Sequence, residues 1–119
     1  MPATGIATYT GHIVGSVRNS GIATYVSAGQ FSHAYNFATR TGTIDVTGFD
    51  GADYTGGSTS PGQRNDFQAA GLAGTTGGRV MVLKGSFFSA PGDAVKYQGG
   101  NFNITGTGYL AGGTFAAER

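Results

Sequence analysis

Residues 96–119 have the sequence KYQGGNFNITGTGYLAGGTFAAER, and this stretch decides the fold. Its apolar side chains occur at every second position, first at Phe102 and Ile104 and then from Tyr109 through Phe115. Alternation of this kind is typical of a β-strand with one buried face, because successive side chains of a strand point to opposite sides. Glycines between the two runs predict a turn. The stretch therefore predicts a hairpin whose last strand can close a barrel.

The same alternation occurs along most of the remaining chain. It is clearest from Phe31 to Phe37, where three aromatic residues and a histidine share one face. Further strands are predicted over residues 5–17, 43–49, 66–74 and 79–88. With one or two strands between residues 21 and 37, the total is seven or eight. The predicted fold class is all-β, a single antiparallel up-and-down β-barrel of about eight strands.

The alternation also predicts which side chains fill the barrel. They are mostly large and aromatic, as expected for a filled rather than a hollow interior. The expected inward residues are Tyr9, Ile13, Phe31, Tyr35, Phe37, Ile44, Val46, Met81, Leu83, Phe87, Phe102, Ile104, Tyr109 and Phe115. The outward positions hold mainly Thr, Ser, Asn and Gly, which predicts a soluble barrel that does not span a membrane and is monomeric when isolated.

Composition limits the classes of partner and of site. The 119 residues form one domain, 1–119, with 23 glycines, a formal net charge of +1 and no cysteine. Because there is no strong basic field, nucleic acid is not an expected partner. The missing cysteines exclude disulfides, thiolate metal sites and cysteine nucleophiles. The first residues lack the features of a signal peptide, so the chain is expected to be either cytoplasmic or, as favoured below, excised from a longer exported protein.

No group of residues has the spacing of a catalytic, metal or cofactor site. His33 lies on the aromatic face and is expected to be a buried imidazole hydrogen-bonded to backbone, whereas His12 is expected at the surface. Asp50 and Asp53 flank a glycine, but their surroundings supply too few oxygens for calcium and favour an Asp-Gly turn. We therefore expect a non-enzymatic protein without a cofactor or a bound metal.

Three residues are the candidate partner-binding residues. Residues 50–65 are rich in Gly, Ser, Thr and Asp, so they are expected to form the longest loop, and they carry Tyr54 and Arg64. Both residue types are enriched at binding hot spots. Phe88 directly follows Phe87, so one ring must point inward and the other outward. Phe88 is expected near the barrel rim, where its ring is either available to a partner or covered by a neighbouring loop.

Several segments resemble a known family of bacterial surface proteins. These are residues 35–44, 84–88, 99–102 and 111–117. They resemble the β-barrel domains of transferrin-binding protein B and related surface lipoproteins, and are most similar to the barrel at the C-terminal end of bacterial proteins that carry a FecR domain. The resemblance implies an eight-stranded barrel that is exported, lies outside the cell or on its outer surface, and binds another protein or macromolecule. The chain lacks the lipidated cysteine and the second lobe of the iron-acquisition members.

Three functions are compatible with the sequence. The leading hypothesis is a non-enzymatic cell-surface or secreted binding module that recognises a macromolecule through its rim loops, residues 50–65 and 89–94. The second is a barrel that carries a small apolar ligand or haem. The third is a structural module that assembles a larger surface protein through exposed strand edges.

Overall fold

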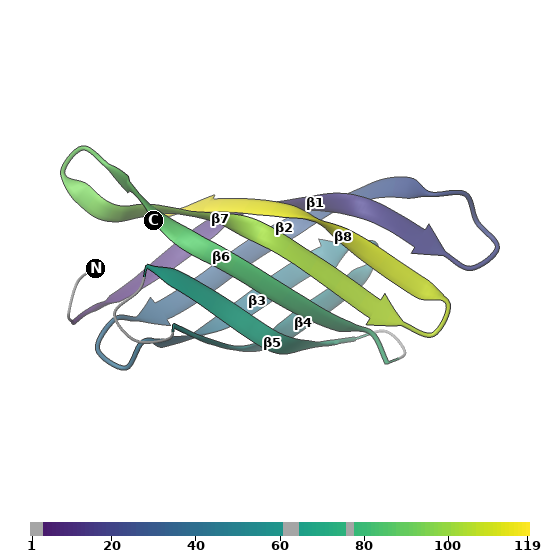
Figure 1. Cartoon of the computed structure of the whole chain (residues 1–119), viewed down its shortest axis with the longest axis horizontal. Coiled ribbons are helices and arrows are strands. Elements are labelled where there is room, and N and C mark those ends of the chain that lie inside the picture. The colour runs from purple at the N-terminus through teal and green to yellow at the C-terminus, as the bar shows by residue number, and fades with distance from the viewer. Residues whose placement is uncertain (1–3, 61–64, 76–77) are drawn as a thin grey trace.

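The computed structural model describes residues 4–60, 65–75 and 78–119, and these form a closed eight-stranded barrel (Figure 1). The strands are β1 (Ile6–Asn19), β2 (Tyr25–Asn36), β3 (Thr41–Phe49), β4 (Ala52–Thr59), β5 (Asp66–Gly74), β6 (Val80–Ala90), β7 (Asp93–Gly106) and β8 (Tyr109–Glu118). Within the described residues, no helix has the length and apolar character needed to cross a lipid bilayer.

Each strand pairs antiparallel with its neighbours in sequence, and β8 pairs with β1 to close the barrel. The closing ladder runs from Thr10 opposite Glu118 to Asn19 opposite Tyr109. The predicted fold class is therefore confirmed, including the role of the last strand. The start of β1 and the end of β8 lie at the same end of the barrel as the β6–β7 hairpin (Figure 1).

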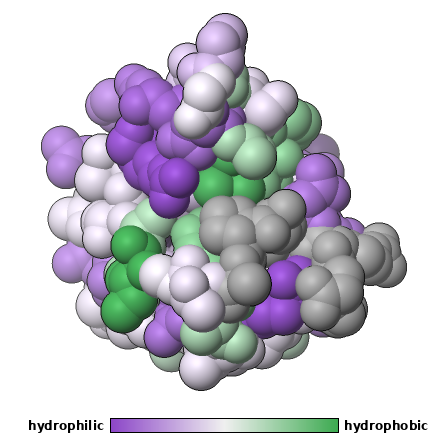
Figure 2. Space-filling model, turned by 90° about the vertical axis from the view of Figure 1, so that its left-hand side faces the viewer, coloured by the Kyte–Doolittle hydropathy of each residue, from purple (hydrophilic) through white to green (hydrophobic). Residues whose placement is uncertain are grey.

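The barrel interior is filled by the alternating side chains. All of the predicted inward residues are buried. Phe87 is the centre of an aromatic cluster, and its ring centroid lies 5.1 to 5.7 Å from those of Tyr35, Phe67, Tyr9 and Phe37. At the end of the barrel shown in Figure 2, hydrophobic residues form a small area near the middle of a more hydrophilic surface. The interior is a packed core.

The prediction of a loop over residues 50–65 is wrong for most of this range, because β4 occupies Ala52–Thr59. Asp50 and Gly51 have φ angles of 51° and 74°, which form the tight turn that joins β3 to β4. This outcome confirms the Asp-Gly turn. The strand was missed because its inward positions after Tyr54 are Gly56 and Ser58, whose small size hides the alternation.

Glycines allow neighbouring strands to approach closely at two places in the wall. Gly85 lies opposite Gly100 on β6 and β7, and Gly15 lies opposite Gly113 on β1 and β8. A Cβ atom at Gly100 would lie 2.5 Å from the Cα atom of Gly85, and a Cβ atom at Gly113 would lie 2.5 Å from the Cα atom of Gly15. Real side chains do not fit at these distances. The barrel is elongated, with extents of 48 × 24 × 19 Å.

Candidate functional site

The structure separates the three predicted binding residues. The Tyr54 side chain lies on the inner face of β4 and is 1% exposed, so its prediction as a surface contact needs correction: the strand turns the ring into the core. Arg64 lies outside the described residues. Phe88 lies on the outer face of β6 and is 53% exposed, whereas its neighbour Phe87 is 2% exposed. Phe88 is therefore the predicted residue whose ring the structure places at the surface.

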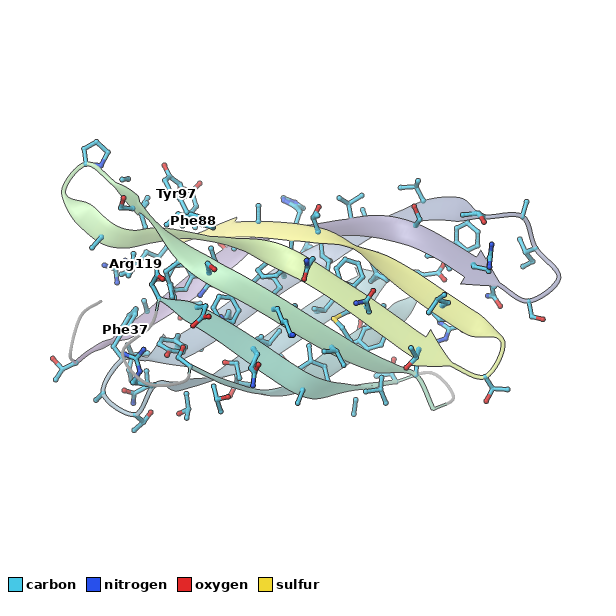
Figure 3. All side chains as sticks on the ribbon, viewed as in Figure 1. Phe37, Phe88, Tyr97 and Arg119 are labelled. Carbon is cyan, nitrogen blue, oxygen red and sulfur yellow. The ribbon has the colours of Figure 1, made fainter. Side chains whose placement is uncertain are left out.

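Phe88 has an aromatic partner that the sequence analysis missed. Tyr97 on β7 lies directly opposite Phe88 in the ladder and is 41% exposed. We call Phe88 and Tyr97 the aromatic ridge. Figure 3 shows both side chains close to the β6–β7 hairpin, near Arg119 and the end of the barrel that holds Phe37.

A register shift in β7 explains why Tyr97 points outward. The ladder passes from Phe88 opposite Tyr97 to Ala90 opposite Asp93, so β7 has two more residues than β6 over this interval. Val95 and Gln98 are both buried, which breaks the strict alternation between them. A bulge of this kind re-aims side chains. Simple alternation from Val95 would have placed Tyr97 inside the barrel.

Charged side chains fix the strand ends beside the aromatic ridge. The Arg119 guanidinium donates hydrogen bonds to both carboxylate oxygens of Asp93, at 3.0 Å from Nε and 2.9 Å from Nη2. The Arg119 side chain and the backbone N–H of Val95 lower the pKa of the Asp93 carboxyl. Lys96 Nζ lies 3.8 Å from Glu118 Oε2. These contacts join the start of β7 to the end of β8 and hold the base of the ridge in place.

His33 lies at the centre of the barrel in a network of side chains. Its Nδ1 atom donates a hydrogen bond to Gln98 Oε1 at 3.1 Å, and its Nε2 atom accepts one from Ser58 Oγ at 2.6 Å. The prediction of a buried imidazole is confirmed, but its partners are side chains rather than backbone. Because both ring nitrogens have partners, neither is free to bind a haem iron. The predicted surface position of His12 is also confirmed.

Acid is expected to destabilise the barrel through His33. Burial lowers the pKa of this imidazole from 6.5 to about 4. Above pH 6.5 the imidazole is neutral in both states, but between pH 6.5 and 4 the unfolded chain binds a proton that the folded chain does not. Unfolding free energy should fall by about 3 kcal/mol across this window. Urea unfolding at several pH values measures the loss.

Two single variants, one at each histidine, test whether His33 causes this loss of stability in acid. His33→Gln should flatten the dependence of unfolding free energy on pH between 6.5 and 4, because the titrating group is gone. His12→Gln is the control for the loss of a histidine, because it removes an imidazole from the exposed surface and not from the core. An equally steep dependence in the His33→Gln variant would show that other groups cause the acid sensitivity.

The acidic residues near the predicted turn bind other parts of the chain. Asp50 Oδ2 accepts hydrogen bonds from the hydroxyl groups of Tyr25 and Tyr109 at 2.7 and 2.8 Å. Asp53 Oδ1 accepts one from the backbone N–H of Gly48 at 2.9 Å. The two carboxylates thus have structural roles at the end of the barrel opposite the aromatic ridge.

The fold is similar to that of a solved surface lipoprotein. The chain superposes on the crystal structure of a surface lipoprotein with a TM-score of 0.72 and 15% sequence identity, covering 98% of this chain and 62% of that one. This chain therefore spans about 62% of the length of that lipoprotein. No family model and no curated protein matches the sequence. At this identity the likeness establishes a shared barrel fold.

Proposed function

We propose that this barrel is a non-enzymatic binding module that recognises a macromolecular partner through the aromatic ridge. The observation that carries the proposal is the pair of adjacent, exposed rings of Phe88 and Tyr97, because the other large hydrophobic side chains exposed among the described residues are aliphatic. Exposed aromatic residues often supply most of the binding energy of an interface. The contacts of Arg119 with Asp93 support the proposal, because a fixed base lowers the entropy cost of binding.

The proposal moves the binding surface from the rim loops to the wall. The turn between β6 and β7 is short, since β6 ends at Ala90 and β7 begins at Asp93. The turn between β3 and β4 is equally short. A surface built on strands holds its side chains more firmly than one built on long loops.

We further propose that the chain is a barrel domain of the transferrin-binding protein B type, closest to the FecR-associated form, and that it is displayed at the cell surface. The segments quoted from the sequence and the fold shared with a surface lipoprotein support this proposal. The longer reading frame provides the test: it is expected to encode an export signal and a FecR domain upstream of this barrel. A frame without an export signal would contradict display at the surface.

Binding is expected to depend on the aromatic ridge. The biotinylated domain is incubated with extracts of cell-surface proteins and glycans, and captured molecules are compared between variants. Phe88→Ser combined with Tyr97→Ser should remove capture, because both rings are lost while the core is untouched. The matched control is Val80→Ser with Val82→Ser, which changes two exposed apolar residues on the same strand as Phe88. Equal capture by both double variants would refute the ridge as the binding surface.

A further inference from the structure

A groove runs along the outer wall beside the aromatic ridge. Its main part has a volume of about 770 Å³ and lies over β5 to β8, with Phe88 at its border. A second, smaller hollow of about 310 Å³ is lined by Tyr97 and by residues of β8 and β1. The groove is open to solvent along its length, so a long molecule can lie in it.

The strand register builds the two walls of this groove. One wall is the aromatic ridge. The floor is the row of residues that lie opposite one another on β5 to β8, namely Asp66, Ser86, Gly99 and Ala116. The Phe88 ring leans over this row, since its Cε2 atom lies 3.4 Å from the place of a Cβ atom at Gly99. The second wall, which we call the polar row, consists of residues that lie opposite one another on β5 to β8, namely Gln68, Lys84, Asn101 and Thr114. The groove therefore crosses the strands, with one aromatic and one polar wall.

The dimensions of the groove suit a single extended chain. The floor row lies two residues from each wall along a strand. The two walls are therefore four residues apart, as Lys84 and Phe88 are on β6, which corresponds to about 13 Å from Cα to Cα. The floor follows successive strands, which lie about 4.8 Å apart. Because the floor side chains on β6 to β8 are small, a molecule that rests on them can contact the Phe88 ring and the polar row.

The chemistry of the walls distinguishes between possible polymers. A peptide usually adds to a barrel or sheet as an extra strand, but the strands under the groove are already paired on both sides: Ser86 lies opposite Asp66 and Gly99, and Asn101 lies opposite Lys84 and Thr114. The polar row offers two amides and one hydroxyl, which both donate and accept hydrogen bonds, and a single cation, Lys84. A ligand with many neutral hydroxyl groups on one edge and an apolar face matches both walls. A chain of sugar rings has this character, because the C–H bonds of a pyranose face pack against aromatic rings.

We propose that this groove binds a linear, neutral, β-1,4-linked oligosaccharide. Sugar rings lie against Phe88 and Tyr97, and their hydroxyl groups bond to the polar row. In an extended β-1,4-linked chain the rise per sugar is close to the spacing between neighbouring strands, so successive rings lie over successive strands. The inference rests on the proposed function and names the chemical class of its partner.

Titration with cellohexaose and with chitohexaose tests the inference. Calorimetry should give saturable binding of at least one of the two, and amide shifts in NMR spectra should concentrate in residues 66–68, 84–88, 97–101 and 114–118. Ala116→Trp fills the floor without removing a wall, and position 116 is exposed, so the variant should fold and lose binding. Asn101→Ala should weaken binding about tenfold, which corresponds to about 1.4 kcal/mol. Val82→Ala, on the same strand but outside the groove, should bind as the wild type does.

Each outcome decides between the two proposals. No saturable binding of either sugar at about 10 mM, a concentration at which even a weak site fills, would overturn the oligosaccharide inference. Shifts outside the groove, or full binding by Ala116→Trp, would overturn it as well. If the sugars fail while the ridge-dependent capture described above yields a protein, the proposed function stands and its partner is a protein. If capture also persists without the ridge, both proposals fail.

Discussion

Replacing Phe87 with alanine is expected to lower the free energy of unfolding by about 3 to 5 kcal/mol. Phe87 packs against four other aromatic rings, those of Tyr9, Tyr35, Phe37 and Phe67. Its removal takes away the apolar surface that these rings bury and leaves a cavity between strands that closure of the barrel holds apart. Urea unfolding, with the midpoint compared at constant m-value, measures the loss.

Phe88→Ala is the matched control, because it removes the same side chain from the adjacent position. The Phe88 ring is exposed, so its loss should change the free energy of unfolding by less than about 1 kcal/mol. The two variants also separate stability from binding: Phe87→Ala should weaken the fold, and Phe88→Ala should weaken capture by the ridge. Equal stability losses would mean that the assignment of inner and outer faces along β6 is wrong.

Much of this architecture could be predicted from the sequence because the barrel obeys one local rule. Successive side chains along each strand alternate between the filled interior and the polar exterior. Runs such as Phe31 to Phe37 therefore reveal both the strand and its buried face. The same rule identified β5 over Asp66–Gly74 and the outward direction of Phe88. Closure by β8 followed from a last strand that needs a partner.

The rule failed where inward residues are small. In β4, Gly56 and Ser58 face inward because larger neighbours from other strands fill the space: a Cβ atom at Gly56 would lie 2.9 Å from the side chain of Leu72, and Ser58 bonds to His33. These neighbours are distant in sequence. Composition therefore predicted a loop, and Tyr54 was assigned to the surface although its ring is buried.

The candidate site depended on a second feature that alternation cannot show. Tyr97 reaches the surface because of the register shift between β6 and β7, and a shift is a property of the pair of strands. One local sign was present, since Gln98 is a poor core residue unless it has a polar partner, and His33 supplies one. The polar row and the groove floor required the full register of four strands.

The filled interior also bears on the hypothesis of a small-ligand carrier. Aromatic rings occupy the space that a ligand would need: Phe31 and Phe115 stack with centroids 4.6 Å apart, and His33 lies 4.8 Å from Phe67. Nothing in this packing favours a carrier over a binding module. The outer wall, by contrast, combines exposed rings with a groove, so the proposed function belongs there.

Replacing Gly100 with alanine is expected to have an effect as large as that of Phe87→Ala. The added Cβ atom would overlap the carbonyl oxygen of Lys84 and lie 2.5 Å from the Cα atom of Gly85, both of which belong to the backbone of β6. A flexible side chain could move away, but a backbone paired on both sides cannot do so without breaking ladder hydrogen bonds. We expect a loss of about 3 to 5 kcal/mol in unfolding free energy, at the upper end of or above the range for overpacking.

Gly57→Ala is the control for this prediction, because it makes the same change in a strand where space is available. The nearest atom to a Cβ at Gly57 is the carbonyl oxygen of Gly42, at 3.8 Å. Alanine there should leave stability unchanged or raise it by about 0.5 to 1 kcal/mol, because glycine costs backbone entropy in a strand. If Gly100→Ala were tolerated as well as Gly57→Ala, β6 and β7 could separate without penalty. The close approach at Gly85 and Gly100 would then not be what shapes the wall.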